Sequence, residues 1–304
     1  MPAQPLFLPG PMHRWVERLA ADLLAVPGAP PVDFAHPAGE PALVPADSVS
    51  WRVFSNPVTL FIGGVAAVLL ELGEPRVRHG VWDHSGFRVD PVMRLRRTGL
   101  AAMVTVYGPE SQARAMIGGV NRLHAQVAGT TADGTPYRAD DPELLDWVQA
   151  TASWGFLEAY AAYDSPLSTC ERDRYYTEAA PAAALYGAVG APRSSAGVAE
   201  LFERTAPRIE ATRTIGEYHE IMRRAPILPA AARPFQKLLV AAAVDLLPPP
   251  LAARLGFPPP ALRPWQRAPL RTAARLAGRL PLTGAPPARA CLRLGLPADR
   301  LYRR

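Results

Sequence analysis

The stretch Asn56–Glu71, NPVTLFIGGVAAVLLE, contains the longest apolar run of the chain and indicates its fold class. The apolar part, residues 58–70, is 13 residues long, which is too short to span a bilayer and is typical of a helix buried in a protein core. Asn56 offers a side-chain acceptor for a helix N-cap, and Pro57 suits the first helical position because its missing N–H costs nothing there. We therefore predict a buried helix that starts at this pair.

The same signals recur along the chain and predict further helices. Asp90-Pro91 and Asp141-Pro142 repeat the acceptor-proline arrangement, and Ser168-x-x-Glu171 and Thr214-x-x-Glu217 have the spacing of a capping box. Residues 194–213 place apolar side chains at helical intervals. Strand signals are weak, since the one Asp-Gly pair lies inside a polar loop. The sequence thus predicts an all-α fold of about nine to eleven helices.

Three parts are expected along the chain. Residues 1–50 combine a short helix, about His13–Leu24, with an arm rich in Pro, Ala and Gly. Residues 51–247 form the helical core, and residues 248–304 form a basic segment rich in Pro and Arg. The N-terminus shows no basic cluster followed by an apolar run and a cleavage site, so we expect a cytoplasmic protein.

Composition excludes several classes of protein. Among 304 residues, 49% are hydrophobic and 20% are charged, which is typical of a globular chain. Its two cysteines, Cys170 and Cys291, lie 121 positions apart, so a disulfide framework, a cysteine zinc site and covalently attached haem c are excluded, and any haem would be noncovalent. The motifs of α/β-hydrolases, P-loop NTPases, HExxH metalloproteases and dinucleotide-binding domains are absent from the sequence.

The net charge of +6 is unevenly distributed. Residues 263–304 contain ten Arg and one acid, a formal +9, which leaves about −3 for the preceding residues. This distribution argues against nucleic-acid binding by the main body. In the tail, arginines recur every fourth position, at 263, 267, 271, 275 and 279. Such a stripe is compatible with peripheral membrane contact and with a solvated helix face.

A histidine on an apolar helix face is the first candidate for chemistry. Residues 109–129 predict one helix, in which Ala113, Ile117 and His124 belong to a single apolar face. A buried histidine bonded to a neighbour and a metal or haem ligand both account for His124. Gly118 and Gly119 lie one or two turns earlier, where they would admit either a flat ring or a neighbouring helix.

The second candidate is the segment 90–98, DPVMRLRRT. Arg94, Arg97 and Thr98 have i, i+3, i+4 spacing and share one helix face. Two guanidinium groups and a hydroxyl on one face would bind propionates, orient bound oxygen or hold an anionic substrate, although a solvated basic face with carboxylate partners is the more common explanation of this spacing. Upstream, His79 and His84 are five residues apart, which is not the spacing of a helical metal site, so a non-haem site with His124 is only weakly signalled.

Together and in order, these segments resemble the catalytic domain of the rubber-oxygenase family, which includes latex-clearing proteins and the oxygenase of mycophenolic acid biosynthesis. The likeness spans about residues 50–225. The matching motifs are Gly63-Gly64 with Pro75, His84-Ser85-x-Phe87-x-x-Asp90-Pro91, Arg94-Leu95-x-Arg97-Thr98, Tyr107-Gly108, His124-x-x-Val127-x-Gly129, Tyr137-x-Ala139-x-Asp141-Pro142 with Leu144, Leu145 and Trp147, and Pro166-Leu167-Ser168 with Glu171, Tyr175-Tyr176 and Glu178.

The resemblance implies a globin-related helical bundle that holds haem b noncovalently, with His124 as the proximal iron ligand and Arg94 and Thr98 near the haem. At the position of Arg97 the latex-clearing enzymes have a distal lysine, and their export signal is absent here, which argues against cleavage of extracellular rubber.

The implied activity is that of an oxygenase, with O2 as co-substrate and an apolar, unsaturated or isoprenoid-like small molecule as substrate. Arg97, Thr98 or His84 would donate to the bound oxygen. Two alternatives stay open: a haem-binding sensor or carrier without turnover, and a helical scaffold without a cofactor.

Overall fold

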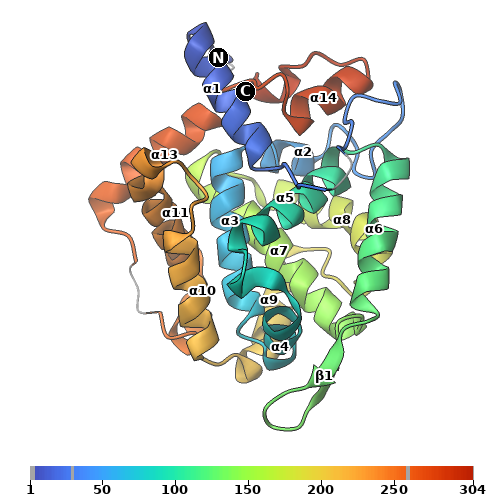
Figure 1. Ribbon diagram of the computed structural model, residues 1–304, viewed down its shortest axis with the longest axis vertical. Coiled ribbons are helices and arrows are strands. Elements are labelled where there is room, and N and C mark those ends of the chain that lie inside the picture. Colours follow the sequence, from blue (N-terminus) through green and yellow to red (C-terminus); the bar gives the residue numbers. More distant parts are fainter. Residues whose placement is uncertain (1–3, 29–30, 258–260, 304) are drawn as a thin grey trace.

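A computed structural model describes residues 4–28, 31–257 and 261–303 (Figure 1). Within these ranges it contains fourteen α-helices and one short hairpin, which confirms the all-α class with more helices than predicted, while the relation to globins stays a prediction. The first helices are α1 (Gly10–Asp22), α2 (Val49–Val53), α3 (Pro57–Glu71), α4 (Pro75–His84), α5 (Pro91–Tyr107) and α6 (Glu110–His124).

The remaining elements complete a bundle around α3, which Figure 1 shows near the middle of the molecule. The later helices are α7 (Pro142–Tyr163), α8 (Thr169–Leu185), α9 (Ser195–Thr205), α10 (Arg213–Arg224), α11 (Arg233–Leu246), α12 (Pro249–Arg254), α13 (Pro264–Ala277) and α14 (Pro286–Arg293). Short 3-10 turns are η1 (Gly86–Arg88), η2 (Ala206–Arg208), η3 (Ala230–Ala232) and η4 (Arg300–Tyr302).

Helices α3 and α7 cross in close contact through two glycines. A Cβ added to Gly63 would lie 2.5 Å from the carbonyl oxygen of Gly155, and Gly155 is equally crowded by Gly63. Neither position therefore has room for a side chain, and the two backbones pack in direct contact. As predicted, α3 is a core helix: Ile62, Val65 and Leu69 are among its fully buried residues.

The predicted helix starts are confirmed with one exception. The side chains of Asn56, Asp90 and Asp141 accept from backbone N–H groups in the first turns of α3, α5 and α7, and Ser168 forms the capping box of α8 with Glu171. The predicted box at Thr214 is wrong, because α10 begins at Arg213. Glu217 instead pairs with the Arg213 guanidinium at 2.8 Å.

The Arg-rich tail packs against the main body. The Nε atoms of Arg271 and Arg275 donate to the carbonyls of Ala162 and Asp164, where α7 ends and leaves carbonyl groups without helical partners. Arg267 pairs with Asp245 at 2.8 Å. Tail residues that belong to the same hydrophobic core as α3 include Leu251, Leu262, Leu270, Ala274, Cys291, Leu301 and Tyr302. Membrane contact through this segment stays a prediction.

The chain after α6 departs from the expected single helix over 109–129. Helix α6 ends at His124. The two strands that follow, β1 (Ala128–Thr130) and β2 (Pro136–Arg138), form an antiparallel hairpin. Gly134 takes φ +89° at the turn, which explains the Asp-Gly pair. Three-residue strands are too short to show the alternation that predicts a strand, so only the turn was visible in the sequence.

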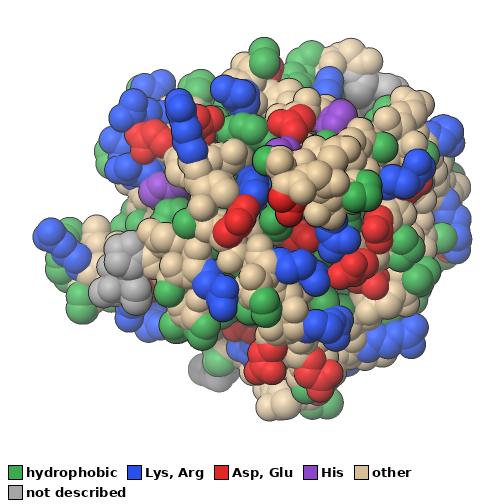
Figure 2. Space-filling model, turned by 90° about the horizontal axis from the view of Figure 1, so that it is seen from below, with side chains coloured by type: hydrophobic (Ala, Val, Ile, Leu, Met, Phe, Trp, Pro, Cys, Tyr) green, Lys and Arg blue, Asp and Glu red, His purple; other side chains and the backbone are tan. Residues whose placement is uncertain are grey.

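The charged surface and the lengths of the apolar helices both bear on whether the chain could enter a membrane. Figure 2, seen from below, shows Arg and acidic side chains interspersed over that face. Within the described ranges, no single helix has the length and apolar composition needed to cross a membrane. Helices α3 and α4 meet these criteria only when taken together, and they are bent by 112° relative to each other.

Candidate functional site

One face of the central helix α3 is only partly covered. Phe61, Gly64, Val68 and Glu71, spaced three, four and three residues apart, remain half-buried, whereas most other residues of this helix are fully buried. Apolar side chains that are likewise half-buried and packed against the core include Val92, Leu95 and Leu100 of α5, Met116 of α6 and Phe156 of α7. Partly buried apolar side chains thus occur on α3, α5, α6 and α7, and the Phe156 ring is the one nearest to Gly64.

A polar cluster stands at the end of this face. Burial raises the pKa of Glu71 to about 7, although the Arg94 guanidinium and the Thr151 hydroxyl, 3.5 Å from Oε1, act in the opposite direction. Burial lowers the pKa of Arg94 despite the nearby Glu71 and Tyr218. Tyr218 of α10 is buried, and its pKa is raised. Helices α3, α5, α7 and α10 thus each contribute one polar group.

His124 lies beside this cluster, at the last position of α6. Burial lowers the pKa of its imidazole, the Arg94 guanidinium lowers it further, and Asp140 opposes both effects. Its Nδ1 is buried and makes no hydrogen bond with any part of the chain that the structure describes. His124 is therefore biased toward the neutral imidazole, the form that coordinates metals.

Arg94 and Thr98 share a helix face, as predicted. Nη1 of Arg94 donates to the Thr98 hydroxyl, which in turn is 3.0 Å from the Arg94 carbonyl. Arg94 interacts electrostatically with both Glu71 and His124, so it connects α3 with α6. Arg97 and Thr98 are exposed, and Arg97 is near enough to Arg94 to lower its pKa.

His84 occupies a different position, at the exposed end of α4. Its Nε2 lies 3.0 Å from the Tyr137 hydroxyl of β2, and His79 contacts Asp83 at 2.8 Å. Among the described residues no group of three His, Cys, Asp or Glu side chains is arranged to hold a metal ion, so the weakly signalled site with His79, His84 and His124 does not form.

The hairpin fixes the chain immediately after His124. Tyr137 stacks with the His79 ring at 6.3 Å and lies over Gly129, its partner across the hairpin. A Cβ on Gly129 would come within 2.5 Å of the Tyr137 hydroxyl, which explains a glycine there. The N–H of Val127 donates to the His124 carbonyl at 3.0 Å. The hairpin is thus anchored to α4 and continuous with the turn that ends α6.

Glu71, Thr151 and Tyr218 are site residues that the sequence did not reveal. A signal existed for Glu71, because it is the carboxylate that terminates the longest apolar run. Thr151 and Tyr218 lie within unremarkable helical sequence, and only the packing of α7 and α10 brings them near Glu71.

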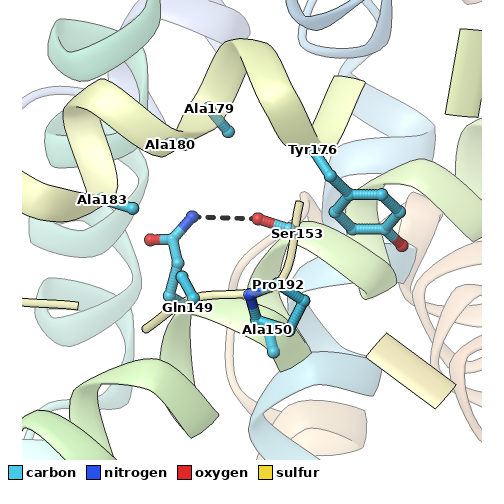
Figure 3. A pocket seen from close by; sticks show the side chains of 9 residues that line it. Gln149, Ala150, Ser153, Tyr176, Ala179, Ala180, Ala183 and Pro192 are labelled. Carbon is cyan, nitrogen blue, oxygen red and sulfur yellow. Dashed lines mark hydrogen bonds between the residues drawn. The ribbon is translucent and has the colours of Figure 1, made fainter. Parts of the chain in front are cut away.

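Two hollows are found whose lining does not include Glu71, Arg94 or His124. A cavity of about 10 Å³ between α7 and α8, shown in Figure 3, is lined by Gln149, Ser153 and Tyr176 and has room for about one water molecule. An open groove of about 510 Å³ lies where α5 begins, against α10. It is lined by Arg88, Pro91, Glu217, Glu220, Ile221, Arg224 and Ala225.

The chain thus forms an all-α domain whose helices α3, α5 and α6 bring Glu71, Arg94 and His124 close together. A family model described as "ER-bound oxygenase mpaB/B'/Rubber oxygenase, catalytic domain" matches residues 51–279, and the chain belongs to this family. The match extends beyond residues 50–225, over which the sequence motifs occur, and includes α11, α12 and α13.

Two mycobacterial proteins are similar to part of the chain. They are the uncharacterized proteins Rv2237 of Mycobacterium tuberculosis and Mb2261 of Mycobacterium bovis, each 31% identical over 118 residues, which is 38% of this chain. The aligned region spans 46% of the length of each relative. No solved structure is significantly similar to the chain.

Proposed function

We propose that this protein is a haem b-dependent oxygenase that uses O2 to oxidise an apolar, unsaturated or isoprenoid-like small molecule. The observation that best supports this is the His124 imidazole, which is biased toward the neutral form and has a buried nitrogen without a partner in the described chain. Membership of an oxygenase family supports the reaction class.

The residues around His124 fit a noncovalent haem. His124 would hold the haem iron, and Arg94 with Thr98 would interact with an anionic propionate or another acceptor. The half-buried face of α3 supplies apolar contacts, and Gly64 on this face has no side chain to obstruct a flat ring. When bound, haem iron would supply the redox centre for reaction with O2.

Glu71 is suited to move a proton in this site. A carboxyl group with a pKa of about 7 exchanges protons readily near neutral pH. The Arg94 guanidinium stabilises the ionised carboxylate, and the Thr151 hydroxyl donates to Oε1. We assign Glu71 as the residue that takes up or delivers a proton during turnover, and Arg94 as the group that stabilises negative charge.

The groove between α5 and α10 is the proposed substrate entrance. Pro91 lies one turn before Arg94 on α5, and Ile221 lies one turn after Tyr218 on α10. Its floor of Pro91, Ile221 and Ala225 suits an apolar chain. Among its lining residues Arg88 pairs with Glu217 and Arg224 with Glu220, so their charges balance, which favours an uncharged substrate.

Haem titration of the purified protein tests the proposal. We expect a Soret band with one haem-binding site per chain, and loss of saturable haem binding in His124→Ala. His219→Ala is the matched control, because His219 is also half-buried with a lowered pKa but packs on Phe257. Haem binding by His124→Ala with an unchanged spectrum would contradict the ligand assignment.

Oxygen consumption separates an oxygenase from a haem carrier. The reduced, haem-loaded protein is mixed with a panel of polyprenyl alkenes and their saturated analogues, and dissolved O2 is followed. We expect consumption with the alkenes and mass gain or cleavage of the product. Haem binding without consumption across the panel would support the sensor or carrier instead.

A further inference from the structure

Two buried aromatic rings meet beside the groove between α5 and α10. Arg88 of η1 and Glu217 of α10 both line the groove. The residues next to them in the chain are Phe87 and Tyr218, whose ring centroids are 5.1 Å apart. Phe87 is 6% exposed and Tyr218 is 2% exposed. The two walls of the groove are thus in contact through this pair of rings.

Tyr218 also adjoins the polar cluster at the end of the half-buried face of α3. Burial raises the pKa of its hydroxyl, and the charges of Glu71 and Arg94 both act on it. Arg94 itself lies one turn after Pro91, which lines the groove. The groove and the cluster are therefore neighbours, and the contact between Phe87 and Tyr218 belongs to both of them.

The surroundings of Phe87 are aromatic on one side and open on the other. Its ring stacks with Trp82 of α4 at 6.1 Å, and the Arg88 guanidinium lies over the same indole at 5.9 Å. In the described chain no atom comes within 4 Å of a Cβ added to Gly86, and Val89 is 91% exposed. A smaller apolar side chain at position 87 would therefore leave space at the groove without removing a side-chain hydrogen bond.

We propose that Phe87 is a specificity-determining residue: its ring, packed on Tyr218, limits how far an uncharged apolar chain extends from the groove toward the polar cluster. This inference rests on the proposed function, in which the groove is the substrate entrance. The lining contains two arginines and two glutamates that form ion pairs with one another, so the occupant that it favours is uncharged. Pro91, Ile221 and Ala225 provide apolar contacts. A longer chain gains such contacts until its end meets the two rings.

Calorimetric titration of the full-length protein with straight-chain alkan-1-ols, from butanol to decanol, tests the proposal. Wild type should bind about fourfold more tightly for each added methylene until the chain reaches Phe87, and beyond that length the affinity should level off. In Phe87→Leu the levelling-off should occur at a longer chain, and in Phe87→Ala, which removes the whole ring, at a longer chain still. Phe87→Leu keeps a large apolar side chain and should retain the wild-type circular dichroism, so it carries the test if Phe87→Ala does not fold.

Two further variants serve as controls. Phe257 contacts His219 of α10 at 5.2 Å and does not line the groove, so Phe257→Leu should level off at the wild-type chain length. Ile221→Ser should weaken the binding of every alcohol about tenfold, which locates the binding in the groove.

The outcome that overturns the proposal is the same levelling-off length in wild type and in folded Phe87→Leu. Equal affinities of wild type and Ile221→Ser, or no alcohol binding by wild type, would overturn it as well. Failure of the proposed function would appear instead in the haem titration and in the oxygen measurement, because alcohol binding requires neither haem nor O2.

Discussion

The two faces of helix α3 differ in what they touch. The face toward α7 is closed, with Gly63 against Gly155 and Ala67 packed beside them. The face that includes Phe61, Val68 and Glu71 is half-buried and ends in a charged cluster. About 100° of rotation around one helix thus separates packing that stabilises the fold from surface suited to a ligand. Adjacent residues of α3 should therefore respond in opposite ways to the same substitution.

Gly63→Ala should have the largest effect, because its methyl group would lie 2.5 Å from the Gly155 carbonyl oxygen. Separating α3 from α7 to relieve this overlap would cost about 3 kcal/mol of unfolding free energy. Urea denaturation followed by circular dichroism measures the change. Gly216→Ala is the control: this glycine is also helical, but nothing lies near its added Cβ, so stability should rise by up to about 1 kcal/mol. Equal stability of Gly63→Ala and wild type would show that the crossing is loosely packed.

Glu71, at the end of the half-buried face of α3, should make the stability of the fold depend on pH. The raised pKa of Glu71 means that the folded state binds its proton more tightly than the unfolded state, so this stabilisation is present below about pH 4.5 and is lost as pH rises through about 7. Glu71→Gln imitates the protonated carboxyl. We therefore expect it to match wild type near pH 5 and to exceed it by about 2 kcal/mol at pH 8.

The measurement is the difference in urea midpoint between Glu71→Gln and wild type at each pH. Taking the difference removes the contribution of His124, whose lowered pKa acts in the opposite direction: its stabilisation is present above the unfolded pKa and is lost as pH falls. A constant difference across this range would show that Glu71 is ionised throughout.

The fold was predictable where local chemistry determines it. Asn56, Asp90 and Asp141 begin helices because each side chain satisfies backbone N–H groups within the next few residues. Arg94 and Thr98 share a face because helical periodicity places them together. The end of α6 was not predictable, since it depends on Tyr137 closing over Gly129, a contact made across a hairpin and against α4.

The candidate site was predictable only in part, for the same reason. Sequence motifs located His124, Arg94 and Thr98, which lie within two consecutive helices. Tyr218 comes from α10, more than 90 residues after His124, and its place beside Glu71 depends on tertiary packing alone. The half-buried carboxylate of Glu71 and its partners are brought together by the whole bundle, so spacing along the chain does not reveal them.

Gly64→Ala should have a small effect of opposite sign to Gly63→Ala. The nearest atom to an added Cβ is on the Phe156 ring at 3.6 Å, an ordinary van der Waals contact. The higher helix propensity of alanine should raise the unfolding free energy by up to about 1 kcal/mol. Thermal unfolding of both variants side by side measures this. Destabilisation comparable to that of Gly63→Ala would show that both faces of α3 are closed.

The smallest expected effect is a shift in the pKa of His124. It tests whether the charges of Arg94 and Asp140 act directly on the His124 imidazole. Arg94→Gln removes the cation that lowers the pKa of His124, so this pKa should rise. Asp140→Asn removes the opposing carboxylate, so the pKa should fall. NMR titration of the imidazole, assigned with His124→Ala, gives both values. Arg97→Gln is the control, because its exposed guanidinium should change this pKa less than Arg94 does. Shifts of the same sign in Arg94→Gln and Asp140→Asn would exclude direct charge interaction, and the cluster would then join α5 to α6 by packing alone.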